Sequence, residues 1–293
     1  MIQKIAILLT CHNRKEKTLT CLTSIYNCYI PAGYTFDIFL VDDGSTDGTA
    51  NAVKDEFPFV KIIEGSGSLF WAGGMRLAWL EAINEGYNAY LLINDDVVLF
   101  DNALQLIIET HQYALKQFRI GGVYVSTTID KETNTISYGG SIMRKSILGN
   151  RSKMVVPSDT PINCNLANAN ILFVNANVVE KIGVFDLKFK QSFADFDYSF
   201  TAFKNNLPVL VCPGIGGYCN NDHANNWSSA KSNLRKRIAY LYSPKGLEYK
   251  EYMYYIRKHF PMSLPYYYMM VWLKTFFPGV WDKFKRKQAF KTY

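Results

Sequence analysis

Acidic residues directly follow two short apolar segments in the first hundred residues of this chain. The apolar run 36–40 leads into the segment VDDGSTD at 41–47. The apolar run 90–93 leads into the segment NDD at 94–96. Short apolar runs that end in a turn are typical of buried strands, and ligands of open α/β sheets bind outside the carboxyl ends of the strands. The two acidic clusters therefore predict one site, suited to a nucleotide and a divalent metal.

The rest of the first two thirds continues this alternation. Strands are expected at 4–9, 36–41, 60–63, 90–93, 170–174 and 208–212. Helices are expected at 16–27, 50–57, 75–86, 101–115 and 196–205, and residues 150–161 are expected to form a polar loop. The pattern predicts an α/β fold, with a Rossmann-like, mostly parallel sheet that is flanked by helices on both faces.

The composition changes from about residue 225 onward. Tyrosine-rich apolar segments are followed by a basic stretch near the end of the chain. We therefore divide the chain into a catalytic domain at 1–225 and a helical extension at 226–293. Aromatic residues beside clustered cations are typical of a segment that lies on an anionic membrane. The alternative is an appendage that packs on the core or on a second copy in a homo-oligomer.

Composition excludes several other classes of protein. Hydrophobic residues make up 48% and charged residues 19% of the chain, as expected for an ordered globular protein. We expect no signal peptide, because the apolar segment 5–10 is too short, and no uninterrupted apolar run of roughly 18 residues occurs in the sequence. The six cysteines lack zinc-like spacing, which favours reduced thiols in a cytoplasmic protein. No nucleic-acid-binding module is present, so we expect no nucleic-acid partner.

Five short motifs occur in a fixed order along the chain. They are TCHNR at 10–14, VDDGSTD at 41–47, GGMR at 73–76, NDD at 94–96 and ADFD at 194–197. Together they resemble the family 2 glycosyltransferases of the GT-A fold, in particular the bacterial rhamnosyltransferase-like branch. The resemblance implies an inverting enzyme that moves a sugar from a UDP- or dTDP-sugar to a glycan or lipid-linked acceptor in bacterial surface polysaccharide synthesis. Sugar nucleotidyltransferases are a weaker match, because the first motif has no glycine.

The resemblance also assigns roles in binding the donor nucleotide. These roles fall on Thr10, Arg14, Asp43, Gly74, Arg76 and Asp95. An ionised Asp43 suits the imide N–H of uracil or thymine, because a carboxylate is purely an acceptor. Backbone N–H groups at a helix start beside Gly74, and the Arg76 guanidinium, suit phosphate. The alternatives are that Asp43 only caps a turn and that Gly74 only marks a junction between a loop and a helix.

The remaining assignments concern metal binding and catalysis. The NDD segment takes the place of the family's DXD motif, so Asp96 would bind Mg²⁺ or Mn²⁺ through hard oxygen atoms. His223 would be a further ligand, with a loop histidine of no special role as the alternative. Asp195 would be the base that deprotonates the acceptor, unless it only favours a helix dipole. A rival interpretation is a non-catalytic GT-A-fold partner subunit, since Asn94 and Ala194 depart from the family's acidic pattern.

Overall fold

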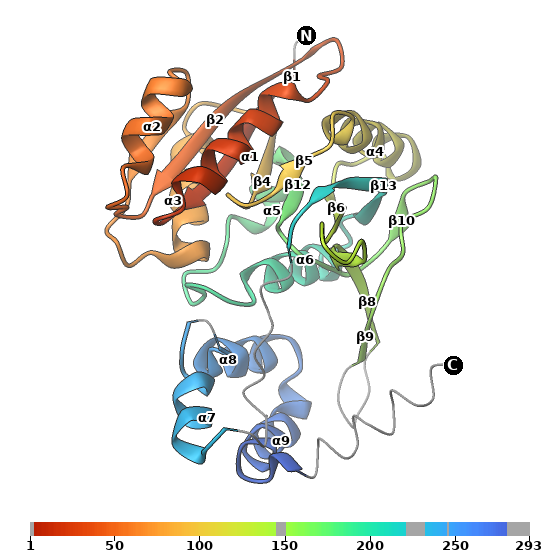
Figure 1. Cartoon of the computed structure of the whole chain (residues 1–293). Helices are drawn as coiled ribbons and strands as arrows, with labels where there is room; N and C mark the ends of the chain where they lie inside the picture. Colours follow the sequence, from red (N-terminus) through yellow and green to blue (C-terminus); the bar gives the residue numbers. More distant parts are fainter. Residues whose placement is uncertain (1–2, 145–150, 221–231, 245, 280–293) are drawn as a thin grey trace. The chain divides into compact units, whose positions relative to one another are not determined.

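The computed structural model describes residues 3–144, 151–220, 232–244 and 246–279. These residues form two compact units. One is an α/β unit within the first 221 residues, and the other is a helical unit that also includes the segment Gln191–Phe193. Figure 1 shows the elements of each unit.

The α/β unit is built on one large sheet. Its strands are β1 (Gln3–Cys11), β2 (Tyr34–Asp42), β3 (Lys61–Glu64), β4 (Ala89–Ile93), β5 (Val98–Leu99), β6 (Val123–Ile129), β7 (Ile136–Tyr138), β10 (Ile162–Asn163), β12 (Ile171–Asn175) and β13 (Val209–Tyr218). The strand order is β10-β13-β6-β12-β4-β1-β2-β3, with β5 paired to β13 and β7 paired to β6.

Most strands of this order run in the same direction. β1 to β4, β6 and β13 are mutually parallel, whereas β12 is antiparallel to both of its neighbours and β10 is antiparallel to β13. The predicted mainly parallel α/β sheet is confirmed. The reversal of β12 was not predicted, because an apolar run reports burial but not strand direction.

A second, smaller sheet follows the order β11-β8-β9. Its strands are β8 (Gly140–Arg144), β9 (Arg151–Met154) and β11 (Leu166–Ala167). The predicted loop at 150–161 is therefore wrong at its start, since residues 151–154 form a strand. The polar composition of this stretch did not indicate a strand, although residues 151–154 pair with β8.

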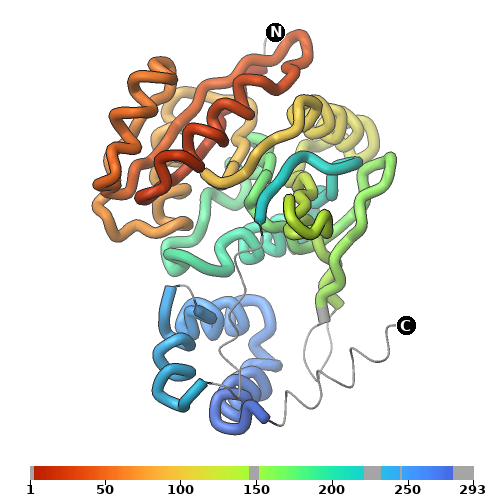
Figure 2. The backbone as a smooth tube through the Cα atoms, in the orientation of Figure 1, coloured from red at the N-terminus to blue at the C-terminus, as the bar shows by residue number. Residues whose placement is uncertain are grey.

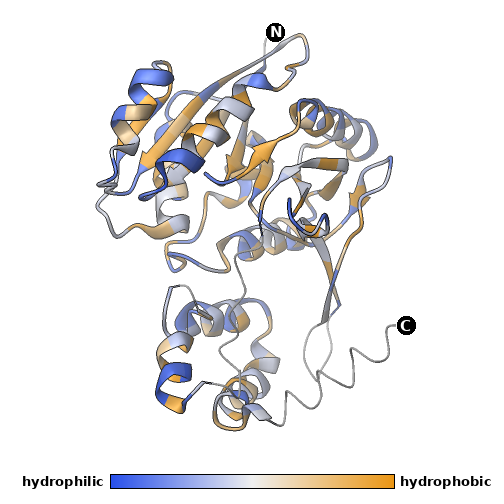
Figure 3. Ribbon diagram, in the orientation of Figure 1, coloured by the Kyte–Doolittle hydropathy of each residue, from blue (hydrophilic) through white to orange (hydrophobic). Residues whose placement is uncertain are grey.

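Helices cover both faces of the large sheet. They are α1 (Lys15–Asn27), α2 (Thr49–Glu56), α3 (Phe70–Ile83), α4 (Ala103–Phe118), α5 (Ala176–Ile182) and α6 (Ala194–Lys204). Alternate residues of β1 explain the two layers. Ile7 and Leu9 pack with α1 and α4 in one core, whereas Thr10 faces Gly74 of α3 on the other side. The apolar strands between polar outer helix faces are visible in Figure 3.

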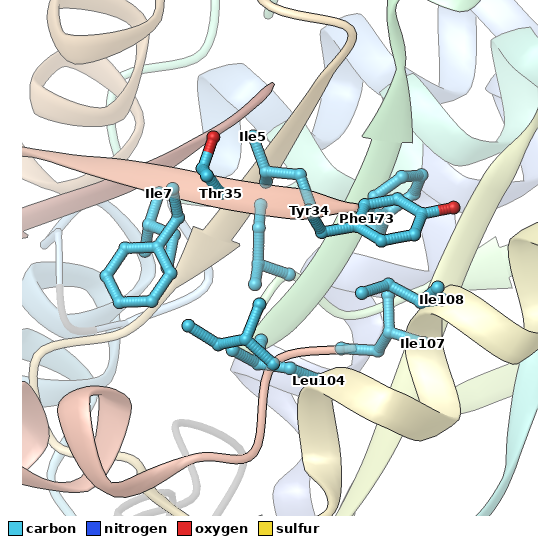
Figure 4. Close-up of a pocket in the computed structure, with 11 residues that line it drawn as sticks. Ile5, Ile7, Tyr34, Thr35, Leu104, Ile107, Ile108 and Phe173 are labelled. Carbon is cyan, nitrogen blue, oxygen red and sulfur yellow. The ribbon is translucent and has the colours of Figure 1, made fainter. Parts of the chain in front are cut away.

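A small cavity lies within the core between the sheet and α4 (Figure 4). Ile5, Tyr34, Leu104 and Phe173 are among the residues that line it. Its volume is about 10 Å³, which is room for at most one water molecule. Ile5 and Tyr34 belong to the amino-terminal parts of β1 and β2, whereas the acidic clusters follow the carboxyl ends of the strands. The cavity therefore lies at the opposite end of the strands from the acidic clusters and is not a substrate site.

The helical unit contains α7 (Leu234–Leu241), α8 (Tyr249–His259) and α9 (Leu264–Phe276), and its backbone can be followed in blue in Figure 2. Aromatic contacts hold its helices together. The rings of Tyr249 and Trp272 lie 5.9 Å apart, and those of Tyr252 and Tyr267 meet edge to face. Among the described residues, no helix has both the length and the hydropathy required to cross a bilayer.

Candidate active site

The carboxyl ends of three neighbouring strands bring the predicted polar residues together. β1 lies between β2 and β4, and all three are parallel. Arg14 follows β1, and its Nη1 atom donates to Asp95 Oδ1 at 3.0 Å and to Asp96 Oδ2 at 2.9 Å. Lys17 Nζ lies 3.9 Å from Asp96 Oδ2. The acidic cluster after β4 therefore has two cationic side chains beside it, both from the start of α1.

Asp95 is the most deeply placed of these acids. Its residue is 6% exposed, and its Oδ2 atom is buried with no hydrogen-bond partner among the described residues. Burial raises the pKa of Asp95 to about 6, although the neighbouring Arg14 acts in the opposite direction. An orphaned buried carboxylate oxygen is costly, so this atom marks a position where a ligand donor or a cation would be stabilised.

The carboxylates fit a divalent cation in part. Mg²⁺ is commonly held by one or two carboxylates together with substrate phosphates, and Asp95 and Asp96 supply hard oxygen atoms of that kind. Within the described parts of the chain, no three or more His, Cys, Asp or Glu side chains form a metal-binding group. The predicted ligand His223 lies outside the described residues.

Asn94, the first residue of the cluster, has a different environment. Its Oδ1 atom accepts a hydrogen bond from Trp71 Nε1 at 2.8 Å. Asp96 Oδ1 in turn accepts a weak hydrogen bond from the Cys219 thiol at 3.7 Å, and Asn170 Nδ2 donates to the same sulfur. Asn170 and Cys219 were not predicted at this site, because they belong to elements that only the folded sheet brings close.

Asp43 is engaged by the backbone of the β3–α3 connection. Its carboxylate accepts from the N–H groups of Gly67 at 2.7 Å, Leu69 at 2.9 Å and Phe70 at 3.0 Å. A carboxylate has about four acceptor positions, so most of those of Asp43 are used to organise the start of α3. The neighbouring Asp42 accepts one N–H, from Ser45, and is likewise buried.

Gly74 lies against the predicted base-binding residue Thr10. A Cβ added at Gly74 would lie 2.8 Å from Thr10 Cβ and closer still to its Oγ1. Glycine is therefore required here by the close approach of α3 to β1. The helix begins at Phe70, not at residue 75 as predicted, so the N–H of Gly74 lies in the second turn instead of at the helix start.

Arg76 and Asp195 come from the same side of the sheet. Arg76, on α3, donates from Nη1 to the carbonyl of Phe189 at 3.4 Å, and burial lowers the pKa of its guanidinium. Asp195 is half-buried in the first turn of α6. It accepts from the N–H groups of Phe196 at 2.8 Å and Ala169 at 3.2 Å.

The contacts of Asp195 connect it to the acidic cluster. Ala169 lies just before β12, and the carbonyl of Asn170 accepts from the N–H of Asn94 at 3.1 Å. Asp195 is thus held beside the strand that pairs with β4. Burial raises the pKa of Asp195, and the N–H donors oppose this effect only in part. A carboxylate with a raised pKa is better suited to accept a proton than an exposed one.

Comparison with known proteins decides the family. The model of the family described as glycosyl transferase family 2 matches residues 6–164. The chain belongs to glycosyl transferase family 2. Transfer of a glycosyl group is therefore its class of reaction. No curated protein matches the chain.

Solved structures agree with the fold. S. aureus TarS, residues 1–349, in complex with UDP-GlcNAc aligns with a TM-score of 0.56 at 15% identity, over 88% of this chain and 73% of TarS. The mannosyltransferase PcManGT from Pyrobaculum calidifontis, in complex with GDP-Man and Mn²⁺, aligns with a TM-score of 0.54 at 11% identity, over 93% of this chain and 70% of PcManGT. These similarities establish the GT-A fold of this glycosyltransferase.

Proposed function

We propose that this family 2 enzyme is an inverting glycosyltransferase that uses a UDP- or dTDP-sugar, with Asp195 as its catalytic base. The single observation that carries the proposal is the half-buried Asp195, with its raised pKa, held beside the strand that pairs with β4. The motif order at 10–14, 41–47, 73–76 and 94–96 supports the same assignment.

The proposed reaction is a single displacement at the anomeric carbon. Asp195 takes the proton of the acceptor hydroxyl, whose oxygen forms a bond to the anomeric carbon. The bond from that carbon to the diphosphate breaks, and its electron pair leaves with the nucleoside diphosphate. Cations at the far side favour this departure because they offset the developing charge, and Arg14, Arg76 and Lys17 are the described cations proposed to act there.

We assign a Mg²⁺ or Mn²⁺ site to Asp96, with Asp95 beside it and His223 as a further candidate. The buried Oδ2 of Asp95, which has no hydrogen-bond partner in the described part of the chain, supports a cation at this position. A bound divalent ion would supply charge neutralisation for the diphosphate. Mn²⁺ in the PcManGT complex supports this choice by analogy only.

For the nucleotide base we retain Thr10 and propose Asp42 in place of the predicted Asp43. The three backbone amides on Asp43 leave it little capacity to accept an imide N–H. Asp42 lies one residue earlier and accepts one N–H, from Ser45, among the described residues. Asp42 is therefore the better candidate for the base, while Asp43 holds α3 in place beside Gly74.

The acceptor is proposed to be a glycan or lipid-linked saccharide of a bacterial surface polysaccharide. Residues 222–293 contain 14 Lys or Arg and 4 Asp or Glu, a net charge of +10 in a chain whose total is +7. Met262, Met269 and Phe277 of the helical unit are exposed by 96%, 51% and 60%. Exposed apolar side chains in a cationic segment support binding to an anionic membrane surface, and a second copy of the chain is the alternative partner.

A non-catalytic partner subunit is the second candidate function. It is supported by Asn94, which stands at a position where the family's pattern has an acid. The Oδ1 atom of Asn94 accepts a hydrogen bond from Trp71. Asp195, Asp95 and Asp96, which are present in the motifs at 194–197 and 94–96, favour the enzyme.

Calorimetric titration with UDP, dTDP, GDP and ADP, each with and without Mn²⁺, tests the proposal. Metal-dependent binding of UDP or dTDP that is lost in Asp96→Ala is expected. Preference for GDP would replace the donor assignment, as the GDP-Man complex of PcManGT makes GDP a necessary comparison. Sugar transfer that survives in Asp195→Asn would refute the assigned base.

A further inference from the structure

The two carboxylate oxygens of Asp96 have different neighbours within the α/β unit. Oδ2 accepts from Arg14 Nη1 at 2.9 Å and lies 3.9 Å from Lys17 Nζ. Oδ1 faces the thiol of Cys219, whose sulfur lies 3.7 Å away. Since two cationic side chains already occupy the side of Oδ2, Oδ1 is the oxygen through which Asp96 would bind a metal ion, and the Cys219 sulfur lies next to that position.

The sulfur of Cys219 is buried and held in place by an amide. Cys219 directly follows β13 and is 3% exposed. Asn170, which is itself 6% exposed, donates from Nδ2 to this sulfur at 3.2 Å. Hydrogen bonds from an outer shell of residues orient the atoms that bind a metal ion, and Asn170 is placed to do this for Cys219.

The separation of Asp96 Oδ1 and Cys219 Sγ suits two ligands of one tetrahedral ion. Bonds of about 2.1 Å to oxygen and about 2.3 Å to sulfur, at a tetrahedral angle, place the two ligand atoms roughly 3.6 Å apart. The same bonds at a right angle, as in an octahedral ion, would place them roughly 3.1 Å apart. The observed 3.7 Å is closer to the tetrahedral arrangement of Zn²⁺ than to the octahedral one that Mg²⁺ demands.

The adjacent Asp95 independently favours a cation here. It is 6% exposed, and its Oδ2 atom is buried with no hydrogen-bond partner in the part of the chain that the structure describes. A nearby divalent ion would offset the cost of burying this oxygen. Because no three His, Cys, Asp or Glu side chains form a metal-binding group among the described residues, Asp96 and Cys219 would supply two of the four ligands, and diphosphate oxygens or water the others.

We propose that Cys219 Sγ and Asp96 Oδ1 together bind a thiophilic divalent cation such as Zn²⁺ or Co²⁺. This inference rests on the proposed role of Asp96 as a metal ligand, and it narrows the choice of metal. The thiol releases its proton to solvent when the sulfur binds the ion. Thiolate ligands select Zn²⁺, whereas Mg²⁺ is bound by oxygen atoms, so Zn²⁺ and Co²⁺ bind this site more tightly than Mg²⁺ and displace it.

Titration of the full-length protein with Co²⁺, with and without UDP, tests the sulfur ligand without an activity assay. A bond between cobalt and a thiolate gives charge-transfer absorption in the near ultraviolet, which oxygen ligands alone do not give. We expect this band in the wild type, its loss in Cys219→Ser and its persistence in Cys21→Ser. Cys21 is the matched control because it is also buried beside the acidic cluster, but its thiol donates to the carbonyl of Asn94 at 3.4 Å and not to a carboxylate.

Calorimetric titration with Zn²⁺ and Mg²⁺ measures the selectivity of the site. Loss of an outer-shell partner typically weakens metal binding by about 10- to 100-fold, so loss of the sulfur ligand in Cys219→Ser should weaken Zn²⁺ binding by at least about 10-fold. Its affinity for Mg²⁺ should stay unchanged, which would also show that the variant is folded. The wild-type spectrum with Co²⁺ tests the proposal even if the variant does not fold.

The possible failures have different meanings. Co²⁺ that binds the wild type without a charge-transfer band, or a band that survives in Cys219→Ser, would overturn the inference and leave Asp96 as a metal ligand. Tighter binding of Mg²⁺ than of Zn²⁺ by the wild type would also overturn it. Binding of no divalent ion at all, with or without UDP, would refute both this inference and the metal site of the proposed function.

Discussion

Replacing Gly74 by alanine should destabilise the α/β unit, whereas the same change at the adjacent Gly73 should not. A Cβ at Gly74 would lie 2.8 Å from Thr10 Cβ, but at Gly73 its nearest neighbour would be Leu69 Cβ at 3.3 Å. Overpacking costs about 1–3 kcal/mol, and Gly→Ala within a helix returns about 1 kcal/mol. The helix term is common to both variants, so Gly74→Ala should be less stable than Gly73→Ala by about 1–3 kcal/mol.

Urea unfolding followed by tryptophan fluorescence measures this difference. Trp79 on α3 is fully buried, so its contribution to the total emission changes when this unit unfolds. Adding Thr10→Ala removes the overlapping hydroxyl and should recover about 1 kcal/mol beyond the sum of the single changes. Equal unfolding midpoints for Gly73→Ala and Gly74→Ala, or no coupling between Thr10 and Gly74, would refute the close contact as the reason for this glycine.

Three further predictions concern the charged residues of the site. The rate should fall as pH decreases through the pKa of Asp195, since a base acts only when it is ionised. Burial raises this pKa above its ordinary value of 3.8, so the rate should begin to fall above pH 3.8. A pH–rate profile that stays flat down to pH 3.8 would contradict the assignment of Asp195 as the base. Asp43→Asn should lose about 1.5–3 kcal/mol of stability, and Asp42→Asn should lose less. Asp42→Asn should in turn weaken UDP binding more than Asp43→Asn does. Equal urea midpoints for the two variants would argue against these roles. Mn²⁺ should raise the Tm of Arg14→Gln by more than that of the wild type, because the guanidinium and the metal share the same carboxylates, and equal shifts in a thermal melt would show otherwise.

The strands and their acidic ends were predictable because both signals are local. An apolar run followed by a turn places residues 41–43 and 94–96 at the carboxyl ends of their strands, and these ends lie on the same side of the sheet when the strands are parallel. The confirmed sheet and family depend on this pattern and on the order of the five motifs. The start of α3 was misplaced by five residues, since Phe70 at the start of this helix adopts a φ angle of +56° that cannot be predicted from its residue type.

Other parts of the site depend on contacts between distant residues. The three amides on Asp43 come from a connection more than twenty residues later in the chain. The thiol of Cys219 reaches Asp96 across 123 positions. Pattern reasoning treats an acid at a strand end as available for a ligand, but only the folded backbone shows which oxygen atoms already have donors.

The reversed strand β12 also affects how the chain acquires its structure during synthesis. β4 and β6 both pair with β12, although β12 comes more than forty residues after β6. As the chain leaves the ribosome, the edges of β4 and β6 therefore stay open until residues 171–175 emerge, and open edges invite pairing with other chains. A fragment cut at residue 164, where the family match ends, would keep both edges open permanently. The segment that identifies the family is thus expected to aggregate when expressed alone.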